Sequence, residues 1–389
     1  MTNEPTRDGA PGPLPPESVT YPLLDGLRGV AALLVLASHA RHFIFEDYAG
    51  QPSSGLLMTL FYGATSLGHQ AVIIFFVLSG FLISGSVYRS VEAGRWRWND
   101  YLSRRLSRLW TVLLPCLLAT LVIDQIAIRL TGSGFYDGAL SFYSSGPGPL
   151  GAVYDPVTLL ANVLFLQDLI SPVYGSNGPL WSLANEFWYY LVFAALFTLT
   201  PARWRTAGLA MSAVLAFAVG ALLDQRLLYL WPAWLVGYGV LRVLPAFIRW
   251  RSVAPVIAPL AGLLVAAALA IPAVMFEQIL PLADLCLGLA FAALVLVLAT
   301  GQPPASFLTG LSDWSAKISY SLYLSHFPVL AALSAFALGN QRQDFGVFPL
   351  VLFALFCLTS LAVAGGLYWA FERHTARVRS LFARLLRVR

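Results

Sequence analysis

Two ionisable residues, Arg28 and His39, lie within one long apolar segment, where charged side chains are costly. They are eleven residues apart. At about 100° per residue this places both on one face of an α-helix, about 16 Å apart along its axis. A guanidinium can hold an anion such as a phosphate, and an imidazole can take up a proton near neutral pH. The alternative is an arginine that reaches the membrane surface and a histidine that bonds a neighbouring helix. The shared face favours the chemical interpretation.

Glu186 is a second candidate, near the start of an apolar segment that follows Gly178-Pro179. If this segment begins at the surface where the His39 segment ends, Glu186 lies about 9 Å and His39 about 7 Å below that surface. A carboxylate at matching depth can fix the tautomer of an imidazole and raise its basicity. The alternative is a structural pair of Glu186 with an arginine or histidine. We therefore predict His39 and Glu186 as a catalytic pair.

A basic cluster, Arg104, Arg105 and Arg108, opens a third apolar segment. Arg105 and Arg108 are three residues apart, so on a helix their guanidinium groups can converge on one phosphate-sized anion. Basic clusters of this kind most often anchor the cytoplasmic end of a membrane helix. The cluster by itself therefore leaves both anchoring and anion binding open.

His326 lies in a further apolar segment, with the hydroxyl groups of Ser319 and Tyr323 on adjacent faces of the predicted helix. Packing and hydrogen bonding account for this histidine as well as a catalytic role does, and both interpretations stay open. Asp124 and Asp284, also within apolar segments, are weaker candidates.

The composition tells what kind of elements position these residues. Of 389 residues, 58% are hydrophobic and only 11% are charged, against about 25% charged in soluble domains. Apolar runs recur that are long enough to cross a hydrocarbon core of about 30 Å. The basic residues lie at the ends of these runs rather than in one patch, which argues against a nucleic-acid partner. We predict an all-α, polytopic membrane helix bundle.

We place about ten transmembrane helices, at 24–44, 68–88, 106–128, 180–200, 205–223, 228–247, 254–274, 280–300, 315–338 and 349–371. Arginines, and the only lysine, gather on alternate connections between these spans. The positive-inside rule makes those connections cytoplasmic. Both termini are then cytoplasmic as well, which requires an even number of spans.

The chain divides into three predicted parts. Residues 1–20 are rich in Pro and Gly and are expected to form a disordered cytoplasmic tail. Residues 21–373 form the membrane domain, and 374–389 form a basic cytoplasmic tail. The membrane domain includes a long outer loop, 129–179, in which the short apolar stretch 156–170 is expected to be an interfacial or re-entrant helix rather than a further span. A loop of this length is more often functional than idle.

Together these residues resemble the acyltransferase-3 family of integral membrane acyltransferases, from about Leu24 to Arg373. Four landmarks carry the resemblance: Arg28 with ten residues before His39, the Phe-Phe-Val-Leu-Ser-Gly-Phe-Leu-Ile run at 75–83, Arg105-x-x-Arg108, and Trp181-Ser182-Leu183-x-x-Glu186. The 319–324 run before His326 and Phe371-Glu372-Arg373 are also similar. The chain departs from the family pattern at two boundary positions, His69 and His374.

The resemblance implies an O-acyltransferase of the bacterial inner (cytoplasmic) membrane, similar to the cell-envelope polysaccharide O-acetyltransferases. It assigns the binding of acyl-coenzyme A, expected to be acetyl-coenzyme A, to Arg28, Arg105 and Arg108, and the transfer to His39. We place substrate binding at Asp25, Trp181, Ser182, Tyr323 and His326. The expected partners are the acyl donor, a glycan or other hydroxyl acceptor, and membrane lipid, with no metal and no nucleic acid.

The spacing of Arg28 and His39 adds a hypothesis, because about 16 Å along a helix is comparable to the length of a pantetheine arm. A nucleotide held inside could then present its thioester near the outer face, where His39 acts as a general base or as a transient acyl carrier. One rival is an exporter of a glycan or a small acylated molecule, although the chain shows no repeated half and no paired broken helices. Another is an acyltransferase for a cytoplasmic small molecule such as a macrolide.

Overall fold

The computed structural model describes residues 21–52, 55–132, 134–140, 146–147, 151–249, 262, 280–300 and 306–385. Within these ranges the chain is helical, and its extended segments form only isolated bridges. Eight helices in the described part are long and apolar enough to cross a membrane. The predicted all-α membrane bundle is therefore confirmed. The chain divides into two compact units, which are described separately.

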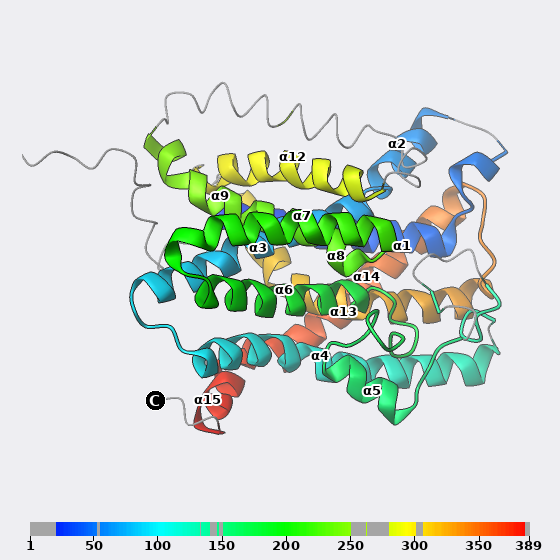
Figure 1. Cartoon of the computed structure of the whole chain (residues 1–389). Helices are drawn as coiled ribbons and strands as arrows, with labels where there is room; N and C mark the ends of the chain where they lie inside the picture. The colour runs from blue at the N-terminus through cyan, green and yellow to red at the C-terminus, as the bar shows by residue number, and fades with distance from the viewer. Residues whose placement is uncertain are drawn as a thin grey trace, which may run out of the picture. The chain divides into compact units, whose positions relative to one another are not determined.

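One unit comprises residues 25–72, 96–188 and 305–389 and contains every predicted site residue. Its helices are α1 (Pro22–Ile44, from Asp25 on), α2 (Leu56–Thr65), α4 (Trp98–Thr131), α5 (Pro156–Val163), the first part of α6 (Leu180–Leu199), α13 (Ser306–Leu338), α14 (Val347–Ala370) and α15 (Thr375–Leu385). Helix α13 packs along both α4 and α14, and α15 packs on α4 (Figure 1). The long α13 thus forms the centre of this unit.

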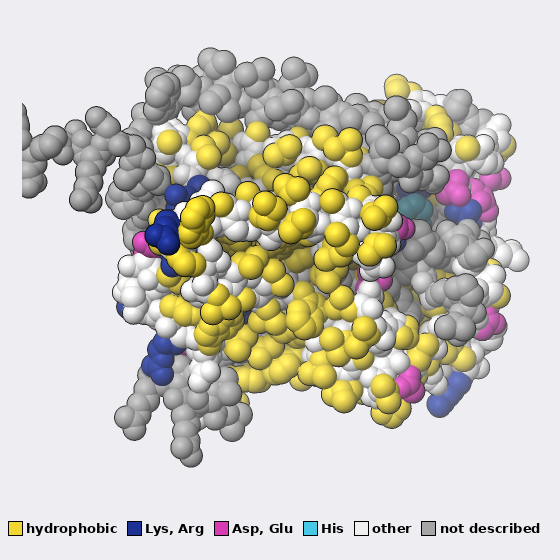
Figure 2. All heavy atoms as spheres, viewed as in Figure 1, with side chains coloured by type: hydrophobic (Ala, Val, Ile, Leu, Met, Phe, Trp, Pro, Cys, Tyr) yellow, Lys and Arg dark blue, Asp and Glu magenta, His cyan; other side chains and the backbone are white. Residues whose placement is uncertain are grey.

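The other unit comprises residues 1–24, 73–95 and 189–304. Its helices are α3 (Gly68–Glu92, from Ile73 on), the second part of α6, α7 (Arg205–Leu223), α8 (Arg226–Tyr229), α9 (Trp231–Arg249) and α12 (Leu280–Thr300). Trp234 is fully buried in it and donates a 3.2 Å hydrogen bond to Ser79. Hydrophobic side chains cover α7 and α12 (Figure 2), and Met211, Val214 and Leu222 are well exposed. Such a surface is suited to contact with lipid.

The predicted spans agree closely with the helices. Nine of the ten coincide with a helix. The tail at 1–20, and the span at 254–274 except for residue 262, lie outside the described residues. Helix α6 is the one coincident helix that is not among the eight by hydropathy. Asn185 and Glu186, together with its aromatic residues, make it more polar than a simple lipid-facing span. These residues belong instead to the interior of a bundle.

Helix α1, which carries both Arg28 and His39, is fixed by two close packing contacts. A Cβ atom added at Gly29 would lie 2.1 Å from the Ser315 hydroxyl and 3.0 Å from the Ala316 backbone nitrogen. A Cβ atom at Gly68 would lie 2.6 Å from the Ser38 side chain. Small residues permit this approach of helices in a membrane. The stretch of α1 between the two candidate residues is thus held at each end.

Replacing Gly29 with valine is expected to push α1 away from α13 and to destabilise the protein by about 1–3 kcal/mol, the usual effect of overpacking. Thermal unfolding of the detergent-solubilised protein measures this. The matched control is Gly366→Val, at a helical glycine in α14 with open space around it. Equal melting temperatures for the two variants would contradict the close contact.

Candidate active site

Arg28 lies near the start of α1, where it contacts both α13 and its own first turn. Its Nη2 donates a 3.2 Å hydrogen bond to the carbonyl of Ala316 and forms a 3.2 Å ion pair with Asp25. Its Nε is buried and has no hydrogen-bond partner among the described residues. The charged groups close enough to interact with it electrostatically are Asp25, Arg108, Glu372 and Glu186. The structure therefore brings Arg28 together with three other predicted site residues.

Glu372 is a member of this cluster that the sequence interpretation did not assign. It is only 4% exposed, and its Oε1 pairs with Arg108 at 3.0 Å. Its Oε2 accepts hydrogen bonds from the backbone (3.2 Å) and hydroxyl (2.6 Å) of Ser321. The carboxylate thus links the end of α14 to α4 and α13. The signal available in the sequence was its place in Phe371-Glu372-Arg373, immediately after the last span.

Two of the three arginines of the basic cluster, Arg105 and Arg108, stack on different tyrosines. The Arg108 guanidinium lies 5.3 Å from the ring centroid of Tyr320, and that of Arg105 lies 5.5 Å from the ring centroid of Tyr101. Arg108 thus belongs to the Arg28–Glu372 cluster, whereas Arg105 lies beside an aromatic group at the start of α4 that also contains Trp96 and Trp98. Their binding of one shared anion stays a prediction.

His39 makes its hydrogen bond to a second histidine. Its Nδ1 lies 2.8 Å from Nε2 of His326 on α13. The Nδ1 of His326 lies 2.9 Å from the carbonyl of Leu322, one turn earlier in the same helix. The two rings are nearly parallel, at 8°, with centroids 5.1 Å apart, so they are offset and meet through their nitrogens. His326 is 1% exposed and His39 is half-buried.

Glu186 lies on α6 and interacts with a different set of residues. It is close enough to Arg28, Tyr320 and Tyr323 to interact with them electrostatically. The contacts of the His39 ring are instead with His326 and Phe327. The hydrogen bond of the His39 imidazole is therefore made with a histidine, and the catalytic pairing of His39 with Glu186 stays a prediction.

Ser182 and Tyr323 join α6 to the histidine pair. The Ser182 and Tyr323 hydroxyls lie 2.6 Å apart, and Tyr323 also donates to the carbonyl of Pro179 at 3.3 Å. The Tyr323 ring centroid is 5.9 Å from that of His326. Trp181, half-buried, precedes Ser182. The substrate-binding positions predicted on α6 and α13 thus adjoin one another.

The backbone of α13 has a free carbonyl at this point, because Pro328 has no N–H to donate to Leu324. Asn177, fully buried in the loop before α6, donates a 2.7 Å hydrogen bond to that carbonyl. The sequence interpretation missed Asn177. A proline inside a predicted helix indicates an unpaired carbonyl four residues earlier, but not which side chain satisfies it.

Asp124 anchors the same loop to α4. This fully buried carboxylate accepts hydrogen bonds from the backbone (2.8 Å) and hydroxyl (2.7 Å) of Ser176 and from Tyr154 (3.1 Å). All its bonds go to the loop, so its role here is structural. Together, Asp124 and Asn177 fix the segment that leads into Trp181 and Ser182.

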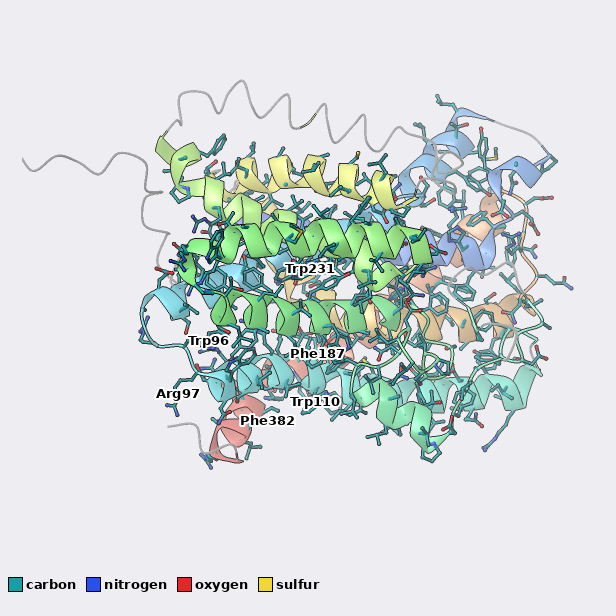
Figure 3. All side chains as sticks on the ribbon, in the orientation of Figure 1. Trp96, Arg97, Trp110, Phe187, Trp231 and Phe382 are labelled. Atoms are coloured by element: carbon teal, nitrogen blue, oxygen red, sulfur yellow. The ribbon has the colours of Figure 1, made fainter. Side chains whose placement is uncertain are left out.

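The predicted short helix in this loop exists as α5, which ends earlier than expected, at Val163. Asp155 caps its start, and the hydrogen bond from the Thr158 hydroxyl lowers the pKa of Asp155. Past its end, Phe165 stacks between Trp110 and Phe187, with ring centroids 6.5 and 4.2 Å away. Figure 3 shows Trp110 beside Phe382 of α15, whose ring is 5.7 Å from it. The interfacial or re-entrant position of α5 stays a prediction.

The site therefore combines the half-buried imidazole of His39 with Arg28 on the same helix, and Arg28 lies in a charged cluster with Arg108 of α4. Such a set can withdraw a proton from a hydroxyl and hold an anionic donor. In the described part of the chain, no group of His, Cys, Asp and Glu side chains could hold a metal ion.

Comparison with known proteins identifies the family. A family model described as an acyltransferase domain matches residues 21–369. The chain belongs to the acyltransferase-3 family. The enzyme is 30% identical to the acyltransferase MdmB of Streptomyces mycarofaciens over 390 aligned residues, covering 91% of each chain. No solved structure matches this acyltransferase.

Two further relatives of the acyltransferase match over about half of their length. An O-acetyl transferase of Shigella phage Sf6 is 32% identical over 175 residues, which covers 43% of each chain. Nodulation protein 10 of Rhizobium leguminosarum bv. viciae is 29% identical over 205 residues, covering 49% of this chain and 48% of the relative. The resemblance expected from the motifs is thereby confirmed, and the protein is a membrane-embedded acyltransferase.

Proposed function

We propose that this acyltransferase moves an acyl group, acetyl in the first instance, from cytoplasmic acyl-coenzyme A to a hydroxyl of an extracytoplasmic or lipid-linked glycan. The observation that carries the proposal is the placement of Arg28 and His39 on one continuous helix, α1, about 16 Å apart. This separation is comparable to a pantetheine arm. The O-acetyl transferase among the relatives supports transfer to oxygen.

The donor is held at the Arg28 end of α1. Its phosphates carry the negative charge that Arg28, Arg108 and Arg105 attract, and a guanidinium binds phosphate through paired N–H donors. Arg28 has an unpartnered Nε and only one carboxylate, Asp25, within ion-pair distance among the described residues. Arg108 reaches the same region through its pair with Glu372.

The transfer takes place at the His39 end. The imidazole accepts the proton of the acceptor hydroxyl while the oxygen attacks the thioester carbonyl carbon. A C–O bond forms, the C–S bond breaks, and the coenzyme A thiolate leaves and takes the proton from the imidazolium. Ser182 and Tyr323 are joined by a 2.6 Å hydrogen bond. Their hydroxyl groups can hydrogen-bond to the glycan acceptor. The half-buried Trp181 beside them suits a sugar ring.

The test uses purified protein in proteoliposomes, with radiolabelled acetyl-coenzyme A on one side and lipid-linked glycans from a bacterial envelope in the membrane. We expect release of coenzyme A with label on the glycan only when donor is supplied on the cytoplasmic side. Transfer to a soluble small molecule on the donor side would replace the glycan acceptor by a small-molecule one. Absence of coenzyme A release with acetyl and other short acyl donors would overturn the proposal in favour of an exporter.

Arg28→Ala is expected to raise the KM for acetyl-coenzyme A at least tenfold, equivalent to about 1.4 kcal/mol of lost donor binding. The reason is the loss of the guanidinium that lies on the donor side of α1. The KM of Arg28→Lys is expected to lie between those of the wild type and Arg28→Ala, because an ammonium keeps the charge but lacks the planar arrangement of N–H donors. Arg203→Ala, at an exposed arginine, is the control. A change confined to kcat would assign Arg28 another role.

A further inference from the structure

We infer that His326 is a positioning residue that fixes the tautomer of His39, so that Nε2 of His39 carries the lone pair that accepts the hydroxyl proton. The inference rests on the proposed function, because it takes His39 as the base. It adds the identity of the reacting nitrogen and the means by which the fold selects it. A neutral imidazole has one nitrogen that donates and one that accepts, and its partners decide which is which.

The selection begins at the backbone of α13. The Leu322 carbonyl can only accept a hydrogen bond, and it lies 2.9 Å from Nδ1 of His326. This nitrogen therefore carries a hydrogen and donates it. In the neutral ring the other nitrogen, Nε2, is then the acceptor. A carbonyl four residues earlier in a rigid helix cannot reverse its role, which makes it a fixed reference for the pair.

The second step carries this choice to α1. Nε2 of His326 faces Nδ1 of His39 at 2.8 Å. Because the former has no hydrogen, the latter must donate, and the proton of neutral His39 is placed on Nδ1. The lone pair of His39 is left on Nε2, for which the described residues offer no hydrogen-bond partner. The nitrogen that remains free is thus the one that can act as a base.

Packing around the two rings prevents the alternative arrangement. His326 is 1% exposed, so it cannot turn its Nε2 to water. The Phe327 ring meets the His39 ring edge-on, with centroids 5.1 Å apart. Rotation of either imidazole would leave a buried nitrogen unpaired, which costs about 1–3 kcal/mol. The hydrogen-bonded chain from Leu322 through His326 to His39 is therefore the favoured state.

A neutral partner also suits the surroundings. In serine proteases a buried carboxylate orients the histidine, but a fixed charge within a membrane bundle is costly. Two neutral imidazoles orient one another without that charge. When His39 takes up the proton on Nε2, its Nδ1–H still donates to His326, which spreads the positive charge over both rings until the thiolate removes the proton.

The test compares His326→Leu with His326→Gln. Leucine removes the acceptor for the His39 Nδ1–H, whereas the glutamine amide can accept from His39 and donate to Leu322. We expect kcat to fall on the order of 100-fold or more in His326→Leu, with the KM for acetyl-coenzyme A within about twofold of the wild type. We expect His326→Gln to recover at least about tenfold of that loss.

The tautomer itself is measured by ¹⁵N NMR of histidine-labelled protein in detergent, which needs no turnover. We expect His39 to carry its hydrogen on Nδ1 in the wild type and to lose this preference in His326→Leu. A wild-type His39 protonated on Nε2 would overturn the inference, as would equal rates for the leucine and glutamine variants at equal melting temperatures. If the wild-type protein released no coenzyme A from any short acyl donor, the proposed function would fail while the NMR result could still stand.

Discussion

His39→Ala is expected to lower kcat for acyl transfer by about 10²–10⁴-fold, the usual contribution of a general base. The half-buried imidazole is the proposed base of the site, and alanine leaves neither a proton acceptor nor an acyl carrier in its place. Donor binding is expected to persist, because Arg28 lies about 16 Å away along the same helix. Coenzyme A release by the reconstituted enzyme measures kcat, and equilibrium binding of labelled acetyl-coenzyme A measures the donor site.

The control for this substitution is His69→Ala, at an exposed histidine on α3. It is expected to leave kcat unchanged within about twofold, as most surface substitutions do. If His39→Ala retains more than a tenth of the wild-type kcat, another group accepts the proton and His39 is not the base.

Glu372→Ala is expected to lower the free energy of unfolding by about 2–3 kcal/mol, since it removes the charge-assisted hydrogen bonds from the backbone N–H and the hydroxyl of Ser321. The contribution of the ion pair itself is smaller, because the Arg108 side chain is 42% exposed and screened by solvent. Glu372→Gln keeps an oxygen that accepts from Ser321, and its free energy of unfolding is expected to fall less than that of Glu372→Ala. Thermal unfolding in detergent ranks the three proteins.

A double-mutant cycle with Arg108→Ala separates the two effects. A coupling energy between positions 108 and 372 is expected from their 3.0 Å contact. If the single losses simply add, the carboxylate stabilises the fold through Ser321 alone. If Glu372→Ala unfolds no more easily than the wild type, its buried position has no structural role.

The helices were predictable because lipid imposes a simple rule, in which each crossing needs a run of apolar residues of sufficient length. The shared face of Arg28 and His39 was also predictable, because helical periodicity fixes the relative directions of residues within one helix. The N-terminal boundaries of α4 and α13 were less predictable. Both helices continue well past the apolar core, to Trp98 and to Ser306, because polar residues extend a helix as readily beyond the membrane surface.

The hydrogen-bond partner of His39 could not be predicted, because two residues at equal depth in a membrane can lie on helices that do not touch. Glu186 was expected near the level of His39, but only the order of the helices around the bundle decides which side chain reaches the imidazole. That order depends on contacts such as Gly29 with Ser315, which involve small residues on distant segments. The same limit hid the pairing of Arg108 with Glu372, which joins positions far apart in the chain.

The contacts of the loop before α6 were predictable only in part. Pro328 within the last but one span required a donor for the Leu324 carbonyl, and the donor is Asn177. The sequence does not show that this donor comes from a loop residue so far away. Asp124 was a candidate only for being an acid at membrane depth, and its hydrogen bonds to Ser176 and Tyr154 explain its burial.

Because α1 holds both the proposed donor arginine and the proposed base, and close contacts fix it at Gly29 and Ser38, one continuous helix sets the distance between them. A membrane helix answers a thicker or thinner bilayer chiefly by tilting as a whole. Tilting changes the height of each end but not the length between them. The reach required of the acyl donor is therefore set by the protein and is independent of the lipid around it.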